Sequence, residues 1–138
     1  MGEFEMLEHA ADARVRLRGD SLEDVFATAA RALVWLMVGD SQLERSRSRS
    51  LELAADSPTQ LLVDWLDELI FLFETEAWLV AEAELDIQPG WRLRAVTRGQ
   101  PHDARRQPIE TVVKATTHHR LRLERRDSGW EAEVVFDL

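Results

Sequence analysis

The residue types best suited to chemistry lie near the two ends of the chain and in one polar segment between them. They are His9, Asp12, Lys114, His119 and Asp137. Asp137 is the least expected, because it closes a strand-like alternation and only Leu138 follows it. The Asp137 carboxylate and the Leu138 terminal carboxylate, joined by Asp12 if the first and last strands are neighbours, would form an all-oxygen site. Such a site suits a hard cation such as Ca²⁺ or Mg²⁺ better than zinc. The alternative is that Asp137 merely ends a strand.

The other polar candidates each have a structural alternative. Lys114 alternates with Val112 and Thr116, so it could lie beside the carboxylates or form a surface salt bridge. His118 and His119 are adjacent, and adjacent strand residues point to opposite faces, so one of them is expected to be packed or hydrogen-bonded. His9 and Asp12 could form an acid–imidazole pair or a simple turn.

Common enzyme signatures are missing from the sequence. There is no Gly-rich phosphate loop after a strand, no Gly-x-Ser-x-Gly elbow and no His-Glu-x-x-His pair. The absence of Cys removes disulfides, thiolate metal sites and cysteine nucleophiles. The sequence therefore offers no direct support for an enzyme.

Length and charge further limit the kinds of protein that the chain could be. With 138 residues, the chain is expected to form one domain, residues 1–138, and 45% hydrophobic residues suffice for a core. No apolar run approaches the roughly 18–20 residues that span a bilayer, so we expect a cytoplasmic protein with no membrane contact. The net charge of −9 disfavours direct, sequence-independent nucleic-acid binding.

Hydrophobic periodicity predicts two helices among several strands. Alternation predicts strands over 4–18, 51–53, 79–87, 91–95, 110–117, 119–125 and 130–138. Apolar residues at three- and four-residue steps predict a helix capped by Ser21 and a second helix capped by Ser57. The order predicts an α+β domain, with two amphipathic helices packed on antiparallel β-sheet.

The second predicted helix carries an acidic stripe opposite its buried side. Asp64, Asp67 and Glu68 form this stripe, and Phe71 falls on the same side. The carboxylates could bind a metal, but a solvated helix face is the favoured interpretation. Phe71 could contact a partner, although a single exposed aromatic residue is ordinary.

Taken together, these positions resemble the archease family, in order and over nearly the whole chain. The resemblance rests on His9-Ala10-Ala11-Asp12, 22–26 with Ala29-Ala30, 62–69, Val113-Lys114-Ala115-Thr116-Thr117-His118-His119, and the ending 129–138. The early His-x-Ala-Asp with the terminal Val-x-Phe-Asp-Leu is the distinctive combination. His118 and Asp67 depart from the family pattern, which often has Tyr and Asn at these positions.

The resemblance implies a helper of an RtcB-type RNA ligase. Archeases are small α+β proteins that promote guanylylation of this ligase and keep it turning over in tRNA splicing or RNA repair. By resemblance, the metal ligands fall on Asp12, Asp137 and Leu138, and the functional lysine on Lys114. The cation would be Ca²⁺, with Mg²⁺ or Mn²⁺ as alternatives, while His9 and His119 are weaker candidates. Other hypotheses are a chaperone of another RNA-processing enzyme, such as a tRNA methyltransferase, and a metal-dependent hydrolase.

Overall fold

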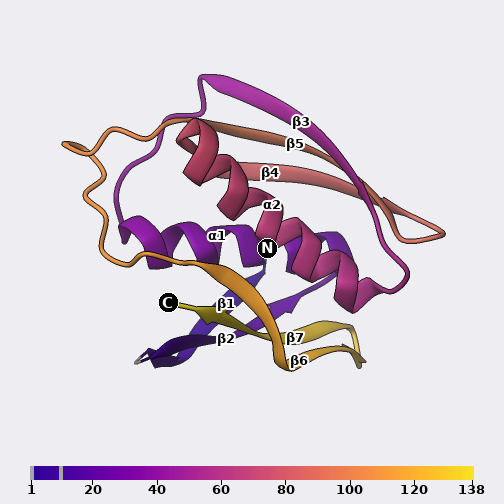
Figure 1. Cartoon of the computed structure of the whole chain (residues 1–138). Helices are drawn as coiled ribbons and strands as arrows, with labels where there is room; N and C mark the ends of the chain where they lie inside the picture. The colour runs from indigo at the N-terminus through magenta and orange to yellow at the C-terminus, as the bar shows by residue number, and fades with distance from the viewer. Residues whose placement is uncertain (1, 10) are drawn as a thin grey trace.

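The chain folds into two antiparallel sheets with two helices between them. The computed structural model describes residues 2–9 and 11–138, with only the backbone of residues 8 and 9. The elements are β1 (Glu3–His9), β2 (Asp12–Gly19), α1 (Leu22–Val38), β3 (Arg47–Ala54), α2 (Pro58–Glu76), β4 (Trp78–Gln88), β5 (Arg92–Pro101), β6 (Ala115–Arg126) and β7 (Gly129–Asp137). Figure 1 shows the helices enclosed by one sheet above and one below. The predicted α+β fold is confirmed, with two sheets rather than one.

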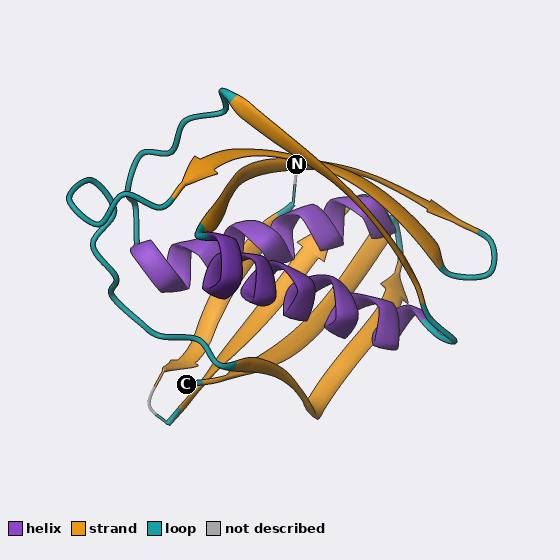
Figure 2. Cartoon of the chain, turned by 45° about the horizontal axis from the view of Figure 1, so that its top comes forward, coloured by secondary structure: helices purple, strands orange, loops and turns teal. Residues whose placement is uncertain are grey.

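The larger sheet joins the two ends of the sequence. Its strand order is β1-β2-β7-β6, while the smaller sheet has the order β3-β5-β4. All strand pairs are antiparallel. Because β2 pairs with β7, residues near the start of the chain lie beside residues at its end, and Figure 2 shows this sheet beneath the helices.

Local capping chemistry sets where both helices begin. The Ser21 side chain accepts a hydrogen bond from the Asp24 N–H at 3.0 Å, and Ser57 accepts one from Gln60 at 3.1 Å. Each bond satisfies an N–H that has no partner inside its helix. Pro58 occupies the first turn of α2, where a missing N–H costs nothing. Both predicted helix starts are therefore confirmed.

The core lies where the helices meet each other and the sheets. Trp65 of α2 is fully buried, and its indole N–H donates to the Phe26 carbonyl of α1 at 2.9 Å. Val15 and Leu17 of β2 and Phe136 of β7 are also fully buried. Their neighbours in sequence point outward, as strand alternation requires. The core thus fixes which side chains of β2 and β7 lie on the outer face of the larger sheet, where Val135 and Glu133 are nonetheless buried.

The prediction of one strand over 4–18 was wrong, because the chain reverses between β1 and β2. The two strands pair with each other, with Phe4 opposite Leu17 and His9 opposite Ala13. No Gly, Pro or Asn stands near the reversal, and the only turn signal in the sequence was the possible turn between His9 and Asp12.

The predicted strands 110–117 and 119–125 were also wrong as two separate elements. Residues 109–114 are outside any strand, and the rest belongs to β6. Within β6 the register shifts, with Thr117 opposite Val135 but Arg122 opposite Glu133. Residues 118–121 therefore bulge out of the ladder, and Arg120 adopts a positive φ of 57° there. The bulge interrupts the alternation, which is why the pattern resembled two strands.

Candidate functional site

The two aspartates singled out by the sequence lie directly opposite each other. Asp12, the first residue of β2, pairs with Asp137, the last residue of β7. Residues paired across antiparallel strands hold their Cβ atoms about 4.5–5.5 Å apart on the same face of the sheet. Asp137 is exposed and Asp12 is half-buried. The condition set by the sequence, that the first and last strands be neighbours, is met through β2.

The backbone of Lys114 is tied to the same place. Its N–H donates to the Asp137 carbonyl at 2.8 Å, and Ala115, the next residue, lies opposite Asp137 at the start of β6. The Lys114 side chain is exposed and forms no salt bridge with the described residues. Asp12, Asp137 and Lys114, which are far apart in the sequence, therefore meet at one end of the larger sheet.

The remaining candidates are placed less centrally. Leu138 is half-buried and packs against the core, next to Asp137. His9 ends β1 with its backbone opposite Ala13, and its side chain is outside the described residues. His119 is exposed on the β6 bulge, where its N–H donates to the Thr117 hydroxyl at 3.1 Å.

His118 is the histidine of the adjacent pair whose side chain forms a hydrogen bond. Its Nε2 lies 2.9 Å from Gln60 Oε1 in the first turn of α2, and Gln60 donates in turn to Asp64 at 2.8 Å. The expectation that one of the two histidines would be hydrogen-bonded is confirmed. Both imidazoles belong to an irregular bulge, so neither follows the alternation of a regular strand.

Sequence reasoning missed the role of Asp67. Its Oδ1 accepts a hydrogen bond from the Thr116 N–H at 2.8 Å, which ties α2 to the beginning of β6 two residues after Lys114. An asparagine, with an equivalent side-chain carbonyl, could accept the same bond. The departure from the family pattern at this position therefore preserves the contact. The helical period showed only that Asp67 faces away from the core.

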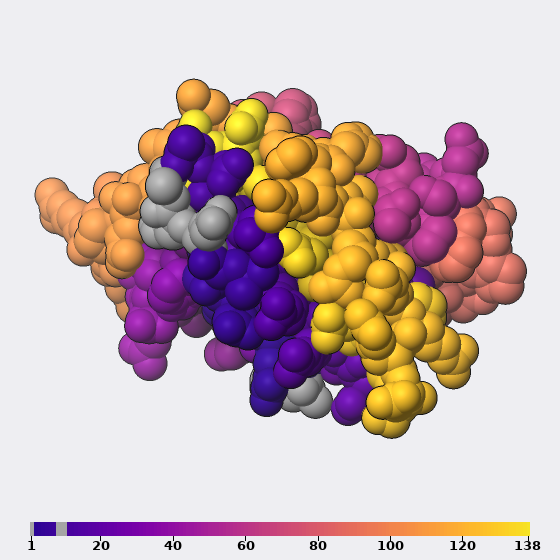
Figure 3. All heavy atoms as spheres, turned by 90° about the horizontal axis from the view of Figure 1, so that it is seen from below, coloured from indigo at the N-terminus to yellow at the C-terminus, as the bar shows by residue number. Residues whose placement is uncertain are grey.

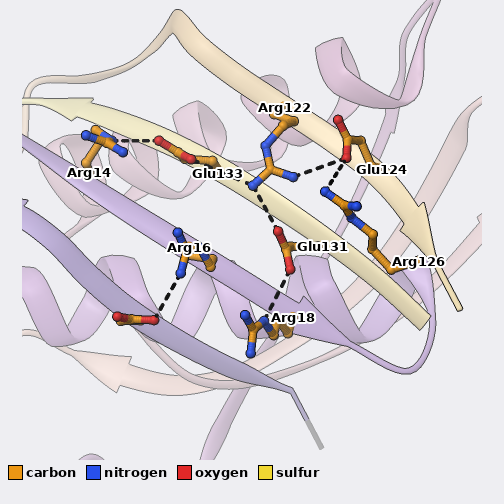
Figure 4. Close-up of polar contacts among 9 residues, drawn as sticks. Arg14, Arg16, Arg18, Arg122, Glu124, Arg126, Glu131 and Glu133 are labelled. Carbon is orange, nitrogen blue, oxygen red and sulfur yellow. Dashed lines mark hydrogen bonds and ion pairs between the residues drawn. The ribbon is translucent and has the colours of Figure 1, made fainter. Parts of the chain in front are cut away.

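The outer face of the larger sheet carries a network of ion pairs beside the aspartates. Arg14 Nε lies 2.6 Å from Glu133 Oε1, and Arg122 bridges Glu131 at 3.0 Å and Glu133 at 3.7 Å (Figure 4). Arg18 reaches Glu131 from the other side at 3.3 Å. The hydrogen bond from Arg122 holds the pKa of Glu131 below its ordinary value, against the opposing effect of burial. Figure 3 views this face, where N-terminal and C-terminal segments lie side by side.

The described side chains that could bind a cation at the aspartate end offer oxygen donors. In the described part of the chain no three His, Asp or Glu side chains gather in a metal-binding group. Asp12 and Asp137 supply two neighbouring carboxylates, and a main-chain oxygen of Leu138 could be a further ligand. This set of described oxygen donors fits a hard cation better than zinc, which prefers nitrogen and sulfur ligands.

No helix among the described residues is long and apolar enough to cross a membrane.

The model of the archease protein family matches residues 4–138 of the chain. Protein archease of Methanopyrus kandleri is 38% identical over 138 residues, covering 98% of this chain and 99% of the relative. Protein archease of Methanosarcina acetivorans is 34% identical, with 98% and 95% covered.

Two solved structures have the same fold. The solution structure of protein 1598 from Methanobacterium thermoautotrophicum superposes with a TM-score of 0.80, at 29% identity and 98% coverage of both chains. The crystal structure of a Thermotoga maritima archease, described as a "possible chaperone", gives a TM-score of 0.66 at 21% identity, with 97% and 96% covered. The match of family, fold and chain length leads to one conclusion: the chain belongs to the archease family.

Proposed function

We propose that this protein is a non-catalytic activator of an RtcB-type RNA ligase, acting in tRNA splicing or RNA repair. It would promote guanylylation of the ligase and sustain multiple turnover. The observation that carries the proposal is the meeting of Asp12, Asp137 and Lys114 at one end of the larger sheet. These are the positions where resemblance to the family places its functional residues.

The chemistry of the three side chains suits assistance rather than catalysis. The carboxylates of Asp12 and Asp137 would hold a divalent cation, Ca²⁺ before Mg²⁺ or Mn²⁺, with a main-chain oxygen of Leu138. A bound cation supplies positive charge next to nucleotide phosphates. Lys114, exposed and without a salt bridge in the described residues, would contact phosphate or a ligase carboxylate. In the part of the chain that the structure describes, no nucleophile paired with a base accompanies them.

The overall charge is consistent with a protein-directed role in the cytoplasm. A net charge of −9 repels RNA at long range, so an assistant with this charge does not compete with the ligase for its substrate. The same charge favours approach to a basic ligase surface.

The test is multiple-turnover ligation of an RNA with 3′-phosphate and 5′-hydroxyl ends, using limiting ligase from the same organism. The wild-type protein should raise turnover, and Asp12→Ala, Lys114→Ala and Asp137→Ala should each lose most of that rise, by about tenfold or more. Asp86→Ala is a matched control, because Asp86 is exposed on the other sheet. Thermal melting should show all four variants folded.

The cation needs a readout that is independent of ligation. Calcium titration calorimetry should detect binding to the wild-type protein and a loss of affinity in Asp137→Asn. Stimulation of turnover by the wild-type protein without any cation binding would remove the metal from the proposal. No stimulation by the wild-type protein would refute the ligase role, and stable binding to a tRNA methyltransferase would then favour the chaperone hypothesis.

A further inference from the structure

The outward side of α2 is only partly covered, by β6, which contacts Gln60 through His118 and Asp67 through the Thr116 N–H. The helix lies along the open edge between the two sheets (Figure 2), with Leu62, Trp65 and Leu66 buried against the core. The opposite side, here called the outer α2 face, consists of Gln60, Asp64, Asp67, Glu68, Phe71 and Glu74. The proposed function uses none of these residues.

Phe71 is the apolar centre of the outer α2 face. Its side chain is 54% exposed, more than any other aromatic residue among the exposed large hydrophobics. Residues three and four positions away on a helix are its surface neighbours, and these are Asp67, Glu68, Glu74 and Thr75. Returning half a phenyl ring from water to an apolar pocket stabilises a complex, and aromatic anchors of this kind carry much of the binding energy at protein interfaces.

The carboxylates around Phe71 are not neutralised. Asp64, Asp67, Glu68 and Glu74 have no ion pair with any described residue. Some acids elsewhere are paired, as in Glu84 with Arg98 and Glu44 with Arg106. The outer α2 face therefore combines an exposed ring with four carboxylates that have no ion pair, although Asp64 and Asp67 each accept a hydrogen bond. Its complement is an apolar pocket flanked by Lys or Arg.

The outer α2 face is continuous with the candidate site. Asp67 accepts the Thr116 N–H, and Thr116 lies opposite Phe136, next to Asp137. A partner covering Phe71 would therefore sit beside the end of the larger sheet where Asp12 and Asp137 meet. Docking and activation would use adjoining but different residues.

We propose that the outer α2 face is the docking surface for a protein that presents an apolar pocket with a basic rim. This inference rests on the proposed function, in which that protein is the ligase. Phe71 enters the pocket, and Asp64, Glu68 and Glu74 meet the cations of its rim. The carboxylates accelerate association and orient the complex, while the ring slows dissociation.

The experiment measures binding of the full-length protein to the ligase by biolayer interferometry, alongside the ligation assay. Phe71→Ala should weaken the affinity by about tenfold or more, mostly through faster dissociation. The double variant D64K/E68K should slow association, with the difference shrinking at high salt. Asp137→Ala should bind like the wild-type protein yet fail to stimulate.

Two controls match these changes away from the outer α2 face. Ile109→Ala removes an exposed apolar side chain, 41% exposed, from the segment before β6, and Asp86→Lys reverses a charge on the other sheet. Both should bind with unchanged affinity. Normal binding by Phe71→Ala and by D64K/E68K, with a wild-type protein that stimulates the ligase, would overturn the docking surface alone. A wild-type protein that neither binds nor stimulates the ligase would overturn the proposed function and the docking surface together.

Discussion

Replacing Arg122 by Met tests whether the ion-pair network stabilises the larger sheet. The guanidinium contacts Glu131 at 3.0 Å, Glu124 at 3.3 Å and Glu133 at 3.7 Å (Figure 4). The side chains of Glu131 and Glu133 are only 18% and 11% exposed, so losing Arg122 leaves two poorly solvated carboxylates with fewer cations. Methionine keeps most of the apolar stem, which restricts the change to the charge.

The size of the effect follows from burial. An exposed ion pair contributes about 0.2–1 kcal/mol, while breaking a fully buried pair costs about 3–5 kcal/mol. The Arg122 contacts lie between these limits, and Arg14 and Arg18 still reach the same glutamates. We therefore expect the free energy of unfolding to fall by about 1–2 kcal/mol.

Urea denaturation at pH 7 measures this loss against a matched control. Arg94→Met breaks the single ion pair between Arg94 and Glu52. The side chains of these two residues are 75% and 74% exposed. That variant should lose less than about 0.5 kcal/mol. Equal losses in the two variants, or a more stable Arg122→Met, would show that partial burial of the carboxylates does not strengthen the network.

The pH dependence gives a second reading of the same contact. The hydrogen bond from Arg122 lowers the pKa of Glu131 from its ordinary 4.5, so ionised Glu131 stabilises the folded state at neutral pH. As the pH falls from 4.5 through the lower pKa of the folded state, Glu131 becomes protonated and its contribution to stability is lost. The difference between wild-type protein and Arg122→Met should therefore shrink on acidification. If the difference in the free energy of unfolding between the two proteins stays constant down to pH 3, the effect of the substitution comes from packing and not from charge.

Two further substitutions test the backbone. Arg120→Gly should raise the free energy of unfolding by about 0.5–1 kcal/mol, because glycine adopts the positive φ of 57° without strain. The control Arg92→Gly, in regular strand β5, should lower the free energy of unfolding. Urea denaturation of both variants checks the sign. Gly99→Ala should lower the free energy of unfolding by more than about 2 kcal/mol, since a Cβ at this position would collide with the Leu79 carbonyl of β4. A melting temperature close to that of the wild-type protein would contradict this geometry.

Local signals in the sequence predicted what depends on neighbouring residues. The caps of α1 and α2 rest on Ser21 and Ser57, which act on N–H groups three positions away. The alternation of Arg14, Val15 and Arg16 fixed the buried and solvent faces of β2. These features need no knowledge of the distant chain, so periodicity and capping rules predict them.

Features that depend on distant pairing could not be read in the same way. The hairpin of β1 and β2 has only a weak turn signal, at His9–Asp12, and the β6 bulge breaks an alternation that looked like two strands. The Asp67 contact with Thr116 joins residues 49 positions apart. The site itself was predicted only conditionally, because Asp12 and Asp137 meet through the pairing of β2 with β7.

The position of the two aspartates on the larger sheet bears on why a cation suits them. Like charges directly opposite each other on paired strands destabilise a sheet, by about 0.2–1 kcal/mol. The rest of this face avoids that cost, since Glu131 and Glu133 are bound by arginines. Among the described residues neither Asp12 nor Asp137 has an ion pair. Among the described residues, this pair of opposed carboxylates therefore has no arginine bound to it, and under the proposed function a divalent cation or a basic group of the ligase would relieve the repulsion between them.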